Sequence, residues 1–172
     1  MKILFKYTTR SRRSNFLRGY DSIINNVSSD NYHVLISVDK DDSSMFPLPE
    51  LKGNYTFVVG ESKNKISAIN RDINEFYYDW DILVNMSDDM VFTQYGFDKI
   101  IGNAFCSHDE VLHFPDQHQG QNCMTMSIMG RKYYNRDKFI YHPEFENLWV
   151  DIIAQEEAQI SQILSTESFA RT

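Results

Sequence analysis

With 172 residues, 42% of them hydrophobic and 14% aromatic, the chain can bury one core but is too short for two ordinary domains, so we predict a single domain over residues 1–172. A net charge of −7 argues against a broad basic surface, because neutralising phosphates needs clustered lysine and arginine, and no nucleic-acid partner is expected. The apolar runs fall far short of the roughly 20 residues of a spanning helix, so we expect a soluble, cytoplasmic protein with no transmembrane segment.

The first hundred residues alternate short apolar runs with segments of helical periodicity. Between the apolar runs, hydrophobic side chains recur at spacings of one, three and four, which predicts helices within 16–27 and 66–77. This alternation is the pattern of repeated βα units, so the sequence predicts an α/β fold around a mainly parallel sheet. The expected strands are 3–7, 33–38, 55–59 and 82–86.

The second half of the chain is predicted to be richer in strands. A helix is expected over 97–105, strands at 111–114 and 124–128, and a last helix from about residue 147. The earlier stretch 41–53 contains two prolines and a Ser-Ser pair, which predicts an exposed, irregular connection rather than a regular element.

Two adjacent carboxylates, Asp88 and Asp89, directly follow the strand expected at 82–86. Ligands of an open parallel sheet bind beyond the carboxyl ends of its strands, where loops and helix N-termini converge. Carboxylate oxygens suit Mg²⁺ or Mn²⁺, which would bridge them to phosphate oxygens. The alternative is a turn in which Ser87 or Asp88 caps the next helix.

Polar side chains also follow the first two expected strands. Asp39 comes after the second strand, where its carboxylate can accept the imide N–H of a uracil ring. Thr8, Thr9 and Arg10 come after the first strand, and their hydroxyl and guanidinium donors can hold a base or phosphates. The alternatives are a solvated turn for Asp39 and a solvated helix start for the basic residues.

The second predicted helix carries two further candidates, Lys65 and Asn70. Lys65 stands in the first turn, from which its ammonium group can point toward an anion at the helix N-terminus. The alternative for Lys65 is an ordinary surface lysine. The repeated placement of polar groups at strand ends favours a binding site at this edge of the sheet.

These residues, in this order, resemble family 2 glycosyltransferases and related GT-A enzymes. Four stretches carry the resemblance in the first hundred residues: Thr8-Thr9-Arg10, Asp39, the segment 65–70 and Ser87-Asp88-Asp89-Met90. Further along, residues 140–151 resemble the acceptor-side segment of small bacterial and phage members. It implies a GT-A fold, a Rossmann-like three-layer α/β/α sandwich, with a UDP-sugar donor and Mn²⁺ or Mg²⁺ at a DxD-type motif. The chain departs from the family at Met86, where many members carry an aspartate.

The resemblance also implies that the two halves of the domain bind different substrates, and it implies a reaction. Residues 1–102 would form the nucleotide-sugar-binding half and residues 103–172 the acceptor-side half. A carbohydrate or other hydroxyl acceptor would attack the anomeric carbon of a hexosyl donor, with inversion, while Asp151 serves as the base. Glu156 is the reserve choice for that base.

Two histidines and an aspartate in the second half are further candidates for the site. His113, Asp116 and His118 follow a predicted strand, from which one of them can reach the metal or the sugar. The alternative is that they are ordinary loop or packing residues.

Two other functions fit paired carboxylates beside phosphates. One is a metal-dependent nucleotidyl- or phosphoryl-transfer enzyme, which would release pyrophosphate from nucleoside triphosphates. The other is a non-catalytic sugar-nucleotide-binding module, an alternative that the short chain and the missing acidic partner at Met86 leave open.

Overall fold

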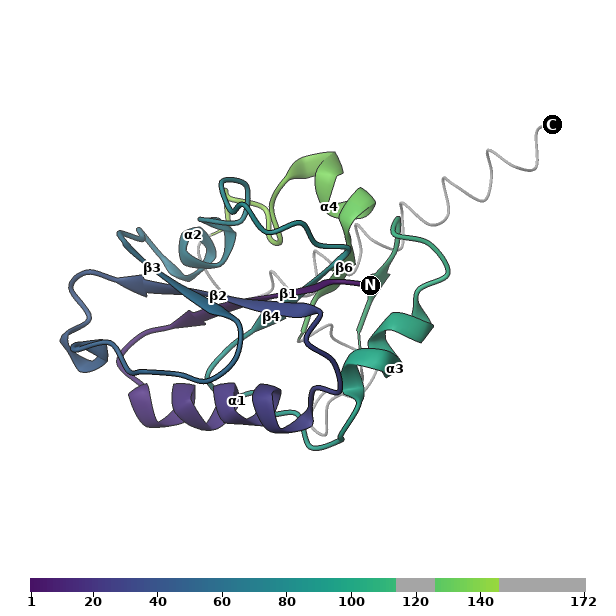
Figure 1. The fold of residues 1–172 in the computed structure, drawn as a ribbon. Coiled ribbons are helices and arrows are strands. Elements are labelled where there is room, and N and C mark those ends of the chain that lie inside the picture. The colour runs from purple at the N-terminus through teal and green to yellow at the C-terminus, as the bar shows by residue number, and fades with distance from the viewer. Residues whose placement is uncertain (114–125, 146–172) are drawn as a thin grey trace.

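The computed structural model describes residues 1–113 and 126–145 (Figure 1). The strands are β1 (Ile3–Thr9), β2 (Tyr32–Asp39), β3 (Tyr55–Gly60), β4 (Ile82–Met86), β5 (Val111–Leu112) and β6 (Ile128–Gly130). The helices are α1 (Arg13–Asn26), α2 (Lys65–Asn70), α3 (Phe97–Ala104) and α4 (Arg131–Asp137), with a 3-10 turn, η1 (Ser43–Met45). None of these helices has the length and apolar character that crossing a bilayer requires.

All six strands of the described residues form one sheet, in the order β3-β2-β1-β4-β6-β5. The first four strands in chain order run parallel, while β6 runs antiparallel to both β4 and β5. The predicted mainly parallel sheet is therefore confirmed. Because Thr9 pairs with Val38 and Tyr7 with Met86, the carboxyl ends of β2, β1 and β4 lie side by side at one edge.

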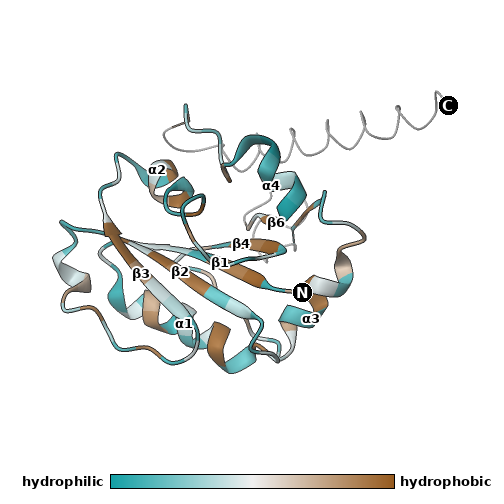
Figure 2. Ribbon diagram, turned by 45° about the horizontal axis from the view of Figure 1, so that its top comes forward, coloured by the Kyte–Doolittle hydropathy of each residue, from teal (hydrophilic) through white to brown (hydrophobic). Residues whose placement is uncertain are grey.

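Helices cover both faces of the sheet, so the predicted three-layer α/β/α sandwich is also confirmed (Figure 1). α1 and α3 pack on one face, where Phe16 and Phe97 join Phe5 of the central strand. The other face packs against α2, α4 and the loop at residues 140–141, with Ile66 and Leu4 in its core. Figure 2 shows apolar residues along the central strands β1 and β4, as expected for strands buried on both faces.

The helix α2 is shorter than predicted. It begins at a capping box, in which the Asn64 side chain accepts a hydrogen bond from Ser67 N at 2.8 Å and the Ser67 hydroxyl accepts one from Asn64 N. It ends at Asn70, because Arg71 is extended and Asp72 adopts a left-handed conformation with φ 74°. Ile73 and Phe76 still pack in the core without continuing the helix, whereas Tyr77 is exposed, so the prediction of a helix to residue 77 was wrong.

The second half differs from the prediction in two places. Of the strand expected at 124–128, residues 124–125 lie outside the described residues and 126–127 form no strand; β6 begins at Ile128, and the helix α4 follows it directly, which the periodicity did not indicate. α4 has few apolar residues, and of its side chains only Tyr134 is buried. β5 covers only the first two residues of the strand expected at 111–114, and residue 114 lies outside the described residues.

Candidate active site

Thr9 and Asp88 meet at the carboxyl edge of the central strands. The Thr9 hydroxyl donates a hydrogen bond to Asp88 Oδ2 at 3.2 Å, and both side chains are buried, with 3% and 7% exposed. The contact follows from the strand register. Tyr7 of β1 pairs with Met86 of β4, and Thr9 and Asp88 each stand two residues further along the chain. The structure thus brings together two residues that the sequence assigned to one site.

Asp88 keeps one oxygen free in a buried position. Its Oδ1 has no hydrogen-bond partner among the described residues. Burial raises the pKa of Asp88 to about 6, and the Thr9 hydroxyl, the Arg10 backbone N–H and the charge of Arg12 oppose this rise only in part. A buried carboxylate oxygen without a partner costs free energy, and a bound cation would remove that cost.

Asp89 completes a pair of carboxylates with different exposure. It is exposed and accepts a hydrogen bond from the Ser87 hydroxyl, whereas Asp88 points inward. The described ranges hold no cluster of three or more acidic, histidine or cysteine side chains that would suit a metal. Two carboxylates suffice for Mg²⁺ or Mn²⁺ when substrate phosphates supply the remaining ligands, so the residues fit such an ion.

The helix-capping alternative for Ser87 and Asp88 is wrong. The next helix, α3, begins at Phe97, and its N-cap is Gly96 in a left-handed conformation. Residues 87–90 instead form a turn in which Met90 N donates to Ser87 O at 3.1 Å.

Asp39 sits at the centre of a second polar group at the same edge. It is 7% exposed, and its two oxygens accept hydrogen bonds from Arg10 Nη1 and Ser62 Oγ, both at 2.7 Å. Arg10 also makes a two-pronged contact with Asp41, at 3.0 and 2.8 Å. The Arg10 guanidinium therefore lies against carboxylates, rather than toward Asp88, in this structure.

Arg71 is a residue of this group that the sequence analysis missed. Its Nη2 donates to the carbonyl of Val38 at 2.9 Å and lies 3.7 Å from Asp39 Oδ1. The side chain is mostly buried, with 16% exposed, and a Cβ at Gly60 would overlap its guanidinium. Gly60, which ends β3, leaves room for this guanidinium, but only the fold shows that Arg71 fills it.

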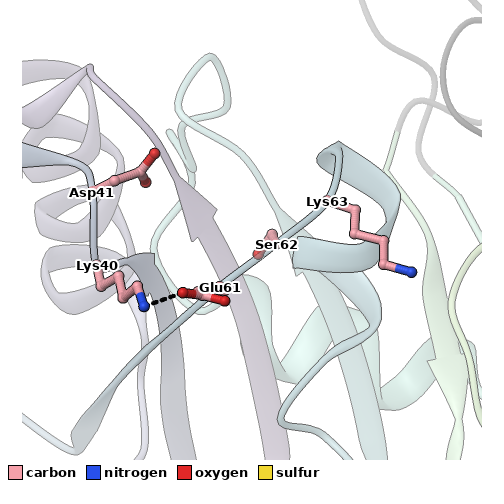
Figure 3. Close-up of a pocket in the computed structure, with 5 residues that line it drawn as sticks. All are labelled: Lys40, Asp41, Glu61, Ser62 and Lys63. Atoms are coloured by element: carbon pink, nitrogen blue, oxygen red, sulfur yellow. Dashed lines mark ion pairs between the residues drawn. The ribbon is translucent and has the colours of Figure 1, made fainter.

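A cavity of about 410 Å³ opens beside Asp39 where β2 and β3 end. Its lining is shown in Figure 3, with Lys40 and Glu61 paired across it and Lys63 turned away from them. The lining residues are Lys40, Asp41, Glu61, Ser62 and Lys63. All five lining residues carry polar or charged groups, and Ser62 connects the cavity directly to Asp39.

Three further predicted site residues are Lys65, Thr8 and Asn70. Lys65 is exposed at the start of α2, and the buried Thr8 hydroxyl has no hydrogen-bond partner among the described residues. The Asn70 side chain donates to Tyr141 O at 2.6 Å and accepts from Ile140 N at 2.9 Å, so it fastens that loop to α2. The proposed contacts of these residues with a nucleotide stay predictions.

The predicted acceptor-side residues lie mostly outside the described residues. Asp151, Glu156, Asp116 and His118 all belong to the ranges 114–125 and 146–172. His113 is described and half-buried, and its Nδ1 has no partner within the part of the chain that the structure describes. Their roles, and the division into halves at residue 102, remain predictions.

No protein-family model matches this chain, and no curated protein sequence matches it. Solved structures do. A mannosyltransferase from Pyrobaculum calidifontis, in complex with GDP-Man and Mn²⁺, superposes with a TM-score of 0.68 at 12% identity, over 87% of this chain. The chain has a GT-A-like glycosyltransferase fold.

Two further structures share the arrangement. Residues 1–349 of S. aureus TarS give a TM-score of 0.62 at 8% identity over 92% of this chain, and HddC from Yersinia pseudotuberculosis gives 0.51 at 10% over 87%. The chain covers about half of the first two, 49% and 55%, and 84% of HddC. At these identities the likeness establishes the fold, and membership of family 2 stays a prediction.

Proposed function

We propose that the chain is a metal-dependent glycosyltransferase that moves a sugar from a nucleotide-sugar donor, a UDP-sugar, to an acceptor hydroxyl. The observation that carries the proposal is Asp88, a buried carboxylate with one unpaired oxygen at the carboxyl edge of a GT-A-like sheet. A carboxylate held this way, with its pKa raised by burial, is typical of a functional site rather than of a solvated turn.

Asp88 and Asp89 are the residues that would hold Mn²⁺ or Mg²⁺. A divalent cation at this place would offset the negative charge that develops on the departing diphosphate. The likeness in fold to a mannosyltransferase bound to Mn²⁺ supports this assignment. Thr9 orients the Asp88 carboxylate by its hydrogen bond to Oδ2, which leaves Oδ1 for the ion.

The group around Asp39 would bind the base. Uracil presents an N–H donor next to carbonyl acceptors, so it needs an acceptor and a donor side by side. Asp39 supplies the acceptor, and Arg71 supplies the donor at 3.7 Å from it. Arg10 and Ser62 already donate to the two Asp39 oxygens, so the uracil N–H would use a second lone pair on one of them.

Asp151 remains the proposed base for the acceptor hydroxyl, with Glu156 in reserve, and the reaction is proposed to invert the anomeric centre. The polar edge at Thr8, Thr9 and Arg10 would face the diphosphate. Removal of the hydroxyl proton by a positioned carboxylate is the general-base step that this chemistry needs.

The direct test is the release of UDP from UDP-sugars in the presence of Mn²⁺. We expect Asp88→Ala to reduce the rate by at least about 100-fold, because the charge on the leaving group would no longer be offset. Asp30→Ala is the matched control, since Asp30 is an exposed aspartate at the amino end of β2, and it should keep the full rate.

Two outcomes would favour the alternatives. Release of pyrophosphate from nucleoside triphosphates, without UDP release from UDP-sugars, would replace the proposal with nucleotidyl transfer. Metal-dependent UDP binding with neither transfer nor slow hydrolysis of the donor would indicate a binding module.

A further inference from the structure

Lys6 is a fully buried lysine in the middle of the central strand β1. Strand alternation places it on the same face as Leu4, and its register partners are Leu35 of β2 and Asn85 of β4. A buried ammonium group costs several kcal/mol unless it is paired and hydrogen-bonded. An apolar residue would stabilise the fold more than a lysine that only filled space here. The contacts of the Lys6 ammonium group therefore point to its role.

The partners of Lys6 form a continuous path to the proposed base site. Its Nζ contacts the Ser37 hydroxyl and lies 3.9 Å from Asp72 Oδ2. The Ser37 hydroxyl donates to the same Asp72 oxygen at 2.5 Å, and Arg71 Nη1 lies 3.3 Å from it. Arg71 then reaches Asp39 through its other terminal nitrogen.

The backbone holds this path in place. Asp72 has a left-handed φ of 74°, a conformation that costs free energy for a residue other than glycine. That conformation directs the Asp72 carboxylate back under the sheet edge, against Ser37 and Lys6, immediately after the residue that faces Asp39.

We propose that Lys6 is a positioning residue: together with Ser37 and Asp72 it fixes the Arg71 guanidinium against Asp39, and so sets the affinity and selectivity for the uracil end of the donor. This inference rests on the proposed function and deepens it. The Arg71 guanidinium is shared between two carboxylates, Asp72 and Asp39. A protonated Lys6 satisfies part of the Asp72 charge and leaves Arg71 available to Asp39, whereas without that charge Asp72 draws Arg71 away.

The same geometry makes the base site sensitive to pH. The charged groups that face Lys6 are Asp72 and Arg71, both from the segment after α2, while β2 and β4 contribute the neutral Ser37 and Asn85. Burial lowers the pKa of Lys6 to about 7, and the charge of Asp72 opposes that shift. Above this pH Lys6 loses its charge, so affinity for the donor should fall as pH rises through 7.

The test is calorimetry of UDP-glucose binding with Mn²⁺ between pH 6.5 and 8.5, because the diphosphate of UDP-glucose does not titrate in that range. We expect Lys6→Met to weaken binding about tenfold at pH 6.5, to lose the pH dependence, and to narrow the preference for UDP-glucose over GDP-mannose. Lys2→Met is the matched control, since Lys2 precedes the same strand at the opposite edge and is exposed.

A double variant separates positioning from packing. Asp72→Asn in the Lys6→Met background removes both charges, so Arg71 returns to Asp39 and most of the lost affinity should return. Thermal melting checks that each variant folds. If Lys6→Met keeps affinity and pH profile within twofold of the unaltered protein, or the double variant recovers nothing, the inference is overturned. If the unaltered protein does not bind UDP-glucose at all, it is the proposed function that fails.

Discussion

The two faces of the central sheet are built from different side chains. Beneath α1 and α3 the core is mostly apolar and aromatic, with Phe16 packed edge to face against Tyr7 at 5.1 Å between ring centroids. The opposite face buries Lys6, Ser37 and Asn85 among its apolar residues. Buried polar groups cost free energy. The first face therefore contributes most of the stability, whereas the polar groups buried in the second face, near the proposed site, lower it.

Removing an aromatic ring from the first face should have the largest effect. Phe16 has no exposed surface, so Phe16→Ala leaves a cavity against Tyr7 and Tyr20. We expect the free energy of unfolding to fall by about 3 to 5 kcal/mol, measured by urea denaturation. A loss below about 1 kcal/mol would contradict the assignment of this face as the main source of stability.

Removing the buried charge from the second face should have the opposite sign. Because the pKa of Lys6 is about 7 instead of 10.5, the unfolded chain binds a proton between these values that the folded chain does not. Stability should therefore rise with pH across this window. Lys6→Met should abolish the rise. With Asp72→Asn added, so that neither charge of the pair stays buried, the free energy of unfolding at pH 7 should increase by about 1 to 4 kcal/mol. A pH profile of Lys6→Met parallel to that of the unaltered protein would refute this expectation.

The buried charge of Asp88 should also lower the stability of the fold, by a smaller amount. Its pKa is raised from 3.8 to about 6, so the folded chain binds more protons than the unfolded chain in this window, and stability falls as pH rises through it. Without metal, Asp88→Asn should be more stable at pH 7 by about 1 to 3 kcal/mol.

Mn²⁺ and UDP-glucose should then reverse the order of the two proteins. Together the two ligands should raise the melting temperature of the unaltered protein, by mass action, and raise that of Asp88→Asn by much less, because only the base site would remain. Equal ligand-induced shifts in the two proteins would remove Asp88 from the proposed metal site.

The position of the residues at the strand ends could be predicted from the sequence. Thr9, Asp39 and Asp88 follow apolar runs that can only be buried strands, and parallel strands bring their carboxyl ends to one edge. That rule depends on position along the chain alone, so the sequence predicts that these residues share one edge, while their binding roles stay predictions.

Arg71, Asp72 and Lys6 escaped prediction for physical reasons. The apolar pattern after residue 66 continues at helical spacing, yet the chain leaves the helix at Arg71, where tertiary contacts of Asn70 outweigh helix propensity. Lys6 interrupts an apolar strand, and only the fold shows that Asp72 lies beneath it, 66 residues further along the chain. Such long-range pairs leave no local signal.

The central claim is that Asp88 and Asp89 bind a divalent cation while Asp39 and Arg71 bind the base of the same nucleotide. A crystal structure with Mn²⁺ and UDP tests this most directly. We expect the ion on Asp88 and Asp89, bridged to the diphosphate, with uracil between Asp39 and Arg71. An ion or a nucleotide bound elsewhere, with these four side chains unliganded, would contradict the account.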